Sequence, residues 1–179
     1  LATQAASSGM DVLVISSDKD LAQLVDKRIT LVDTMKGVAY DRHGVEKKFG
    51  VSPEQIVDYL ALVGDSSDNI PGVPKVGPKT ACKWLQQYGS LDQVIQHAEQ
   101  ILGKVGENLR ASLSQLSLTR ELATIKRDVP LEQTPAKLKK KKEKKIILSK
   151  SPTNCYIQKE TRKKFFTSVS YGNFRNTRD

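Results

Sequence analysis

A segment rich in glycine and proline separates two helical patterns near the middle of this chain of 179 residues. It reads GDSSDNIPGVPKVG over residues 64–77. Glycine and proline end helices and permit tight turns, so one long helix cannot run through this region. Before the segment, Ser52 and Gln55 have the spacing of a capping box and open a helix that stops at Gly64. After it, Pro78 opens another helix, so the sequence predicts two helices joined by a compact turn.

The second half of this segment carries a pattern that is typical of nucleic-acid binding. Gly-Val-Pro-x-Val-Gly-x-Lys-Thr-Ala begins at Gly72 and ends at Ala81. Its glycines let backbone N–H groups approach a phosphate, and the following helix N-terminus adds its dipole. The pattern indicates a helix-hairpin-helix, which grips the DNA backbone independently of base sequence; an ordinary helix-helix turn is the alternative. The candidate DNA-binding residues are Gly72, Lys75, Gly77, Lys79 and Thr80.

Two pairs of aspartates are the candidate catalytic and metal-binding residues. Asp18 and Asp20 lie in SSDKD, and Asp65 and Asp68 lie in GDSSDN; Lys19 is the one basic residue interleaved within either pair. Either pair alone could cap a helix or form an Asx turn. Carboxylates that converge repel one another, and Mg²⁺ removes that cost by taking oxygen ligands. Two such ions can bind the attacking and leaving oxygens of a phosphodiester, so the pairs together indicate phosphoryl chemistry.

The region around the first pair predicts an α/β fold. Residues 11–15 (DVLVI) are apolar and β-branched, as expected for a strand buried on both faces of a parallel sheet, and the helical pattern LAQLV follows. Further strands are expected at residues 29–32 and 38–40. Asp18 and Asp20 would then lie at the carboxyl end of a strand, where such sheets bind ligands.

The remaining pattern divides the chain into three parts. Trp84 and Tyr88 share a helix face with apolar neighbours, which favours a place in the core over stacking on bases. A further amphipathic helix around residues 109–116 and an extended return segment, LATIKRDVPL, follow. We predict the carboxyl-terminal part of an α/β core at 1–50, a helical DNA-binding region with its return segment at 51–134, and a basic, disordered tail at 135–179.

The charge of the chain is concentrated in that tail. Residues 1–136 hold 15 Lys and Arg against 17 Asp and Glu, whereas residues 137–179 hold 14 against 3, which gives the whole chain its net charge of +9. A disordered solvated tail, a basic arm that grips phosphates and a tail altered by a slipped reading frame are the three interpretations of this block. A binder of RNA or of a membrane surface through the tail is a further option.

Composition excludes several classes of protein. No apolar stretch approaches the ~18–20 residues that a bilayer requires, and Cys82 and Cys155 lie far apart. A membrane-spanning, collagen-like or disulfide-scaffold protein is therefore excluded, and a soluble intracellular protein is expected. Cys82 is interpreted as a small packing residue.

With ISSDKDLAQLV, FGVSPEQIVDYLALVGDSSDNIPGVPKVGPKTA and LATIKRDVPL, residues 1–133 closely resemble the 5′-3′ exonuclease domain of bacterial DNA polymerase I, in the flap endonuclease superfamily. The resemblance implies an α/β nuclease core, a helix-three-turn-helix region, and Mg²⁺-dependent removal of 5′ ends and flaps by a bacterial cytoplasmic, nucleoid-associated monomer. It implies that the four aspartates hold two Mg²⁺ ions, which Mn²⁺ could replace, and that backbone carbonyls near Val73 and Val76 hold K⁺. No small-molecule cofactor is expected. Some paralogues lack the second aspartate pair, which this chain keeps.

The chain also departs from the family pattern. The family's amino-terminal half, with an acidic cluster just ahead of Leu1, is absent, so the start is interpreted as a truncation and the metal site as about half complete. The resemblance therefore does not extend to autonomous hydrolysis by residues 1–179. The leading hypothesis is a fragment of a structure-specific DNA 5′ nuclease. The alternative is a non-catalytic DNA-binding module that uses only the hairpin.

Overall fold

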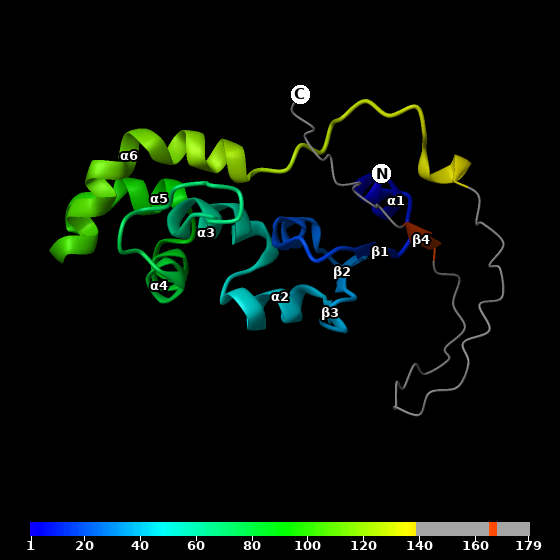
Figure 1. Cartoon of the computed structure of the whole chain (residues 1–179), viewed down its shortest axis with the longest axis horizontal. Helices are drawn as coiled ribbons and strands as arrows, with labels where there is room; N and C mark the ends of the chain where they lie inside the picture. The colour runs from blue at the N-terminus through cyan, green and yellow to red at the C-terminus, as the bar shows by residue number, and fades with distance from the viewer. Residues whose placement is uncertain (139–164, 168–179) are drawn as a thin grey trace, which may run out of the picture.

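The computed structural model of the protein describes residues 1–138 and 165–167. A small sheet lies at one end of this part of the chain, and a group of helices packs at the other (Figure 1). The strand order in the sheet is β3-β2-β1-β4. Its strands are β1 (Val12–Ile15), β2 (Ile29–Asp33), β3 (Val38–Tyr40) and β4 (Phe165–Thr167). The predicted α/β fold class is confirmed, and the three predicted strands lie where the sequence placed them.

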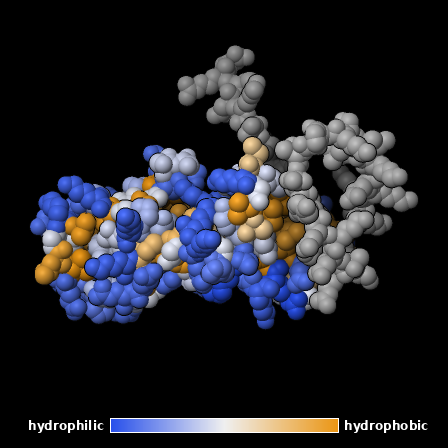
Figure 2. Space-filling view, turned by 90° about the horizontal axis from the view of Figure 1, so that it is seen from below, coloured by the Kyte–Doolittle hydropathy of each residue, from blue (hydrophilic) through white to orange (hydrophobic). Residues whose placement is uncertain are grey.

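Strand β1 pairs in parallel with β2 and with β4, and β2 pairs with β3 in the antiparallel sense. The expectation that β1 is buried on both faces was wrong for most of its length. Val12 is buried, but the side chains from Leu13 to Ile15 are only half-buried. The described elements cover the sheet incompletely, and Figure 2 shows hydrophobic surface at this end of the molecule. Strand β2 alternates between buried and half-buried residues, as a strand with one covered face does.

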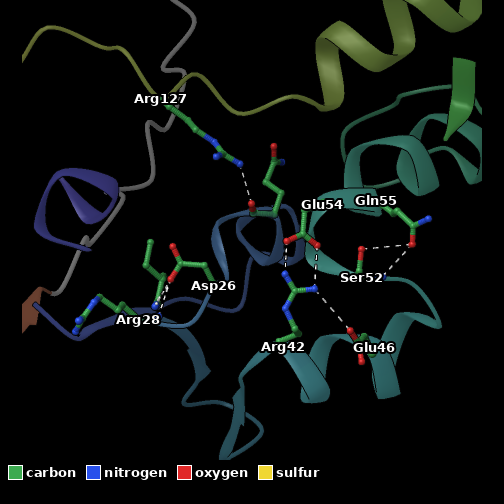
Figure 3. A network of polar contacts seen from close by, with 10 residues as sticks. Asp26, Arg28, Arg42, Glu46, Ser52, Glu54, Gln55 and Arg127 are labelled. Carbon is green, nitrogen blue, oxygen red and sulfur yellow. Dashed lines mark hydrogen bonds and ion pairs between the residues drawn. The ribbon is translucent and has the colours of Figure 1, made fainter. Parts of the chain in front are cut away.

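Short helices flank the sheet. The segment expected to be helical after β1 is a 3-10 helix, η1 (Lys19–Leu24), capped by the Asp18 side chain, which accepts a hydrogen bond from the Asp20 N–H. The first helix, α1 (Ala2–Ser7), has no sequence signal of its own because it lacks a side-chain cap and buries no residue. Helix α2 (Arg42–Phe49) begins at the Asp41 cap and ends at Gly50, whose φ is 77°. Arg42 binds Glu54 and thereby ties α2 to the 3-10 turn η2 (Pro53–Gln55) (Figure 3).

The helical region follows η2. Its helices are α3 (Ile56–Val63), α4 (Pro78–Tyr88), α5 (Leu91–Gln96) and α6 (Gly103–Ala123), with the 3-10 turn η3 (Ala98–Gln100) between α5 and α6. The capping box of Ser52 and Gln55 forms as predicted, and Gly64 and Gly89 end the helices before them. Trp84 is 5% exposed and lies in the core, as expected, while Tyr88 packs against that core and stacks on His97.

A buried carboxylate joins three of these helices. Asp58 on α3 accepts a hydrogen bond from the Leu91 N–H at the start of α5, and its other oxygen lies 3.1 Å from Arg120 Nε on α6. Arg120 also donates to both oxygens of Asp92. Because Asp58 is paired and hydrogen-bonded, it can be buried without an isolated charge. These bonds fix the packing of α3, α5 and α6.

The return segment is extended from Thr124 onward, although its first residues, Leu122 and Ala123, still belong to α6. The predicted boundaries at 50/51 and 134/135 stay predictions. Most of the predicted tail lies outside the described residues; within it the structure describes η4 (Pro135–Lys137) and β4. Within the described ranges, none of the helices combines the length and the apolar character needed to cross a bilayer.

Candidate functional site

The first aspartate pair lies just beyond the carboxyl end of β1, on η1. The Asp18 side chain accepts a hydrogen bond of 2.9 Å from the Asp20 N–H and so caps η1. Asp18 itself is exposed, whereas Asp20 is half-buried. The cap turns the chain so that Asp20 faces away from solvent, toward the segment after α3.

The second pair lies in the loop between α3 and the hairpin. Asp65 and Ile70 form an isolated antiparallel bridge with hydrogen bonds of 2.8 Å in both directions, so the loop closes on itself. Asp65 is 3% exposed, and its Oδ1 accepts a hydrogen bond from the Ser67 N–H. Asp68, near the tip of this loop, is exposed. The Asx turn that the sequence offered as a local role for Asp65 is therefore present.

The structure brings three of the four predicted carboxylates together. Within the described part of the chain, Asp20, Asp65 and Asp68 each offer one carboxylate oxygen, and these oxygens all lie within 4.8 Å of one another. Asp18 lies beside this group but is not one of the three. Oδ1 of Asp20 and Oδ2 of Asp65 are buried and have no hydrogen-bond partner among the described residues. Buried polar atoms are normally satisfied, so these two oxygens mark a place that a cation fits.

The pKa values of Asp20 and Asp65 are shifted in opposite directions. Burial and the neighbouring carboxylates of Asp18, Asp65 and Asp68 raise the pKa of Asp20 to about 6. Burial opposes ionisation of Asp65 as well, but hydrogen bonds from Lys19 and the Ser67 backbone outweigh it and lower the pKa of Asp65.

Lys19 supplies the positive charge of the group. Its Nζ lies 2.6 Å from Asp65 Oδ1. Sequence reasoning noticed Lys19 as the one interleaved cation but assigned it no role. Because Lys19 stands on η1 and Asp65 on the loop after α3, this ion pair also joins the two halves of the group.

The predicted hairpin forms between α3 and α4. Val73 and Val76 are buried, and the Val76 N–H donates to the Val73 carbonyl to close the turn. The Val73 N–H donates to the carbonyl of Leu62 on α3. Lys75 takes a left-handed conformation with φ of 66° at the tip of the turn. Gly77 precedes α4 as its N-cap, and Pro78 occupies the first turn, as predicted.

Gly72 is required by the close approach of two backbone segments. A Cβ at Gly72 would lie 2.3 Å from the carbonyl carbon and oxygen of Val63 and 2.4 Å from the nitrogen of Gly64. A Cβ at Gly77, by contrast, would meet nothing within 4 Å, and φ there is −102°. Contacts within the described chain therefore require glycine at position 72, whereas a larger residue would fit at position 77. Lys75 and Lys79 are exposed beside Gly77, and Thr80 is half-buried.

Two residues on α6 support this region and were missed by sequence reasoning. Asn108 Nδ2 donates to the Pro74 carbonyl at 2.7 Å, and Thr119 Oγ1 donates to the Pro71 carbonyl at 3.3 Å. No sequence signal could have shown these bonds, because they join residues 34 and 48 positions apart. The Cys82 thiol, predicted to be a packing residue, packs against the core and also donates to the carbonyl of Phe49.

Similar proteins include bacterial DNA polymerases. The chain is 46% identical over 143 residues to DNA polymerase I of Mycobacterium tuberculosis, a match that covers 78% of this chain and 16% of that protein. It is 47% identical over 144 residues to DNA polymerase I of Pseudomonas aeruginosa, covering 74% and 15%. The chain thus spans only about 16% of the length of the curated relatives that it matches.

Solved structures share the fold. The chain superposes on T5 5′-exonuclease with bound divalent zinc ions at a TM-score of 0.63 and 25% identity, covering 68% of this chain and 46% of that one. A bacteriophage T5 flap endonuclease in a pseudo-enzyme-product complex with DNA and metal ions gives a TM-score of 0.64 at 23% identity, with the same coverage.

The family can be assigned from the helical region. Residues 51–145 match the family described as "5'-3' exonuclease, C-terminal SAM fold". This match takes in the carboxylate loop, the hairpin and helices α3 to α6, which are the elements that the sequence resemblance identified. The chain therefore belongs to the 5′-3′ exonuclease family, a family of nucleases, and carries its C-terminal SAM-fold region.

Proposed function

We propose that the chain is part of a structure-specific DNA 5′ nuclease, acting as a 5′-3′ exonuclease or flap endonuclease. The observation that carries the proposal is the group of Asp20, Asp65 and Asp68, whose oxygens lie within 4.8 Å of one another beside a hairpin suited to a phosphate backbone. Membership of the nuclease family supports the same activity. The activity, substrates and partners of the longer relatives come to this chain as part of this proposal.

The carboxylates are suited to a hard divalent cation. Their donor atoms are all oxygens, which Mg²⁺ and Mn²⁺ prefer, and two of these oxygens have no hydrogen-bond partner among the described residues. We propose that Asp20, Asp65 and Asp68, with Asp18 beside them, hold Mg²⁺ and that the intact enzyme binds two ions. A bound cation of this kind polarises a phosphate oxygen and offsets the charge that develops on it. The Lys19 ammonium then keeps Asp65 ionised and correctly oriented for binding.

The hairpin would bind the DNA. Exposed Lys75 and Lys79 can contact phosphates, and the open space beside Gly77 allows a DNA backbone to approach the helix N-terminus. Thr80 in the first turn of α4 and Gly72 at the start of the hairpin complete the proposed contact. The carbonyls of Val73 and Val76 would hold K⁺ at this turn. DNA with 5′ ends or flaps is the proposed substrate of a monomer in the bacterial cytoplasm, on nucleoid DNA.

The test is cleavage of a 5′-flap duplex. The chain is incubated with labelled substrate in Mg²⁺ and, separately, in EDTA, and Asp65→Asn is run beside it. Any cleavage by the chain should require Mg²⁺ and be lost in the variant, whereas binding without cleavage leaves the second candidate described below. Exposed Asp128→Asn, in the return segment and away from the group, is the matched control and should cleave normally. Cleavage that persists in Asp65→Asn would contradict the proposed role of the carboxylates.

A non-catalytic DNA-binding module is the second candidate. The observation that favours it is that the hairpin is complete on its own, with its turn closed and its flanks bonded to α3 and α6. Binding of the duplex without cleavage, sensitive to Lys79→Ala but not to Asp65→Asn, would support this module. A chain that lacks residues 137–179 should still bind DNA; if binding is lost, the basic tail rather than the hairpin is the binding element.

A further inference from the structure

The side chain of Gln23, on η1, is hydrogen-bonded to the C-terminal end of α6 and to the start of the return segment. It is 6% exposed, although it is polar. Its Nε2 donates to the carbonyl of Ala123, the last residue of α6, at 3.1 Å, and its Oε1 accepts from the N–H of Ile125 at 3.2 Å. Both ends of the amide are therefore used, and they bind backbone groups about 100 positions away in the chain.

A third hydrogen bond, to the Gln23 backbone, reinforces this contact. The guanidinium of Arg127 donates to the Gln23 backbone carbonyl at 2.7 Å. Figure 3 shows Arg127 extending from the return segment toward η1. The return segment therefore holds both the side chain and the backbone of the same residue. We call these three hydrogen bonds the Gln23 clasp.

The same α6 helix also holds the loop that carries the other carboxylates. Thr119, one turn before the end of α6, donates to the Pro71 carbonyl, three residues after Asp68. Helix α6 is thus bonded at Ala123 to the helix that carries Asp20, and at Thr119 to the segment that follows Asp65 and Asp68. The carboxylates come from two separate parts of the chain, and α6 is bonded to both.

We propose that Gln23 is a positioning residue of the carboxylate group: its clasp to the end of α6 holds η1 so that Asp20 faces Asp65 and Asp68. The inference rests on the proposed metal-binding function of that group. Gln23 lies one helical turn beyond Asp20 on a helix of six residues, so a shift of its side chain moves the whole helix. Mutation of residues that orient metal ligands typically weakens metal binding about 10- to 100-fold.

The test compares two glutamines that make the same kind of bond. Gln23→Met keeps a buried side chain of similar length but removes the bonds to Ala123 and Ile125. Gln86→Met is the matched control, because Gln86 Nε2 on α4 likewise donates to a backbone carbonyl at a helix end, that of Gly50 after α2. Mn²⁺ binding to the full chain is measured by electron paramagnetic resonance, and amide hydrogen exchange is measured over residues 18–25.

We expect Gln23→Met to raise the Mn²⁺ dissociation constant about tenfold and to speed exchange over residues 18–25. Gln86→Met should leave both quantities as in the unmodified chain, even where it lowers the thermal midpoint. An unchanged Mn²⁺ affinity in Gln23→Met would overturn the proposal, as would an equal loss of affinity in both variants, because the effect would then follow stability alone.

The same experiment separates this proposal from the proposed function. If the unmodified chain binds no Mn²⁺, the proposed metal site fails, and hydrogen exchange alone decides the role of the clasp. Faster exchange over residues 18–25 in Gln23→Met, with α3 unchanged, would support a clasp that positions η1. Unchanged exchange there would overturn it.

Discussion

Asp65 and Asp68 of the carboxylate group lie just before the hairpin in the chain, yet the group and the hairpin are held in place in opposite ways. In the hairpin, buried Val73 and Val76 fill the turn, and backbone groups find partners on α3 and α6. In the carboxylate group, three acidic side chains face one another with Lys19 as their near counter-charge, and two oxygens lack hydrogen-bond partners within the described residues.

This difference shows that folding alone forms the hairpin, whereas the carboxylate group would gain stability from a bound cation. The hairpin satisfies its own backbone, so it needs nothing further to keep its shape. The carboxylate group keeps unfavourable charge within the fold, which a protein retains at functional sites and offsets elsewhere. Variants in the hairpin should therefore lower stability or weaken DNA binding. Variants that remove a carboxylate from the group should instead gain stability and lose cation binding.

The largest effect is expected for Gly72→Ala. Its Cβ would lie 2.3 Å from backbone atoms of Val63, and backbone cannot move aside as a flexible side chain can. We expect the free energy of unfolding to fall by about 3 kcal/mol, the upper part of the range for overpacking, in urea titrations. Gly77→Ala is the control and should keep the stability of the unmodified chain, because its Cβ meets nothing within 4 Å. Equal losses in the two variants would show that the hairpin is not fixed by the contact between Gly64 and Gly72.

The next effect concerns pH and Asp20→Asn. Since the pKa of Asp20 is raised to about 6 from 3.8, the folded state binds this proton more tightly than the unfolded state. Ionisation therefore destabilises the fold as pH rises from about 4 to about 6. Asp20→Asn should unfold with a free energy roughly 1 kcal/mol higher at pH 7.5, a value reduced for partial exposure, and show no gain at pH 4.

Added cation should reverse this result. With saturating Mg²⁺, the unmodified chain should gain thermal stability by mass action, and Asp20→Asn should gain less. Melting curves in EDTA and in Mg²⁺ at both pH values check the prediction, with Asp128→Asn as the control. A gain for Asp20→Asn that is the same at pH 4 and at pH 7.5 would contradict the raised pKa.

A smaller effect is expected for Asn108→Ala on α6. The variant loses the bond of 2.7 Å to the Pro74 carbonyl, which should cost about 1 kcal/mol of stability in urea titrations. Because the bond holds the hairpin, DNA affinity should fall as well. Gln86→Ala removes a comparable bond to the Gly50 carbonyl, away from the hairpin, and should leave DNA affinity unchanged. If both variants bind DNA as the unmodified chain does, α6 does not position the hairpin.

The smallest effect is a change in salt dependence. If Lys79 contacts one phosphate, Lys79→Ala should lower the slope of log affinity against log salt by about 0.9 in a fluorescence anisotropy titration with duplex DNA. Lys47→Ala, on the exposed surface of α2, should leave the slope unaltered. An unchanged slope in Lys79→Ala would mean that Lys79 does not contact a phosphate.

The local features of the fold could be predicted from the sequence because their signals are local. The capping box of Ser52 and Gln55, the helix stops at Gly64 and Gly89 and the hairpin pattern from Gly72 each depend on a few adjacent residues. The η1 segment was predicted to be helical, but its 3-10 form and the short α1 were not, since neither follows from apolar spacing.

The features that depend on distant contacts could not be predicted in this way. The bonds of Gln23 to the end of α6, of Asn108 to the hairpin and of Asp58 to α5 and α6 join residues with no shared pattern in sequence. The same limit applies to β1, whose half-burial reflects what covers the sheet rather than its own composition. In the candidate site, the four aspartates could be named from the sequence. That Asp20, rather than Asp18, comes close to Asp65 and Asp68 could be seen only in the structure.

The contact between Gly64 and Gly72 closes the segment between them into a ring, with the Asp65–Ile70 bridge as a second closure just inside it. The contacts that set the approach of α3 to the hairpin before α4 therefore lie at the base of the ring. Residues 66–69 lie outside these contacts. Added residues at the tip would cost little closure entropy, because the entropy of closing a flexible loop changes slowly with its length. Asp68 is thus carried on the part of this region that is freest to vary, on a scaffold that need not change with it.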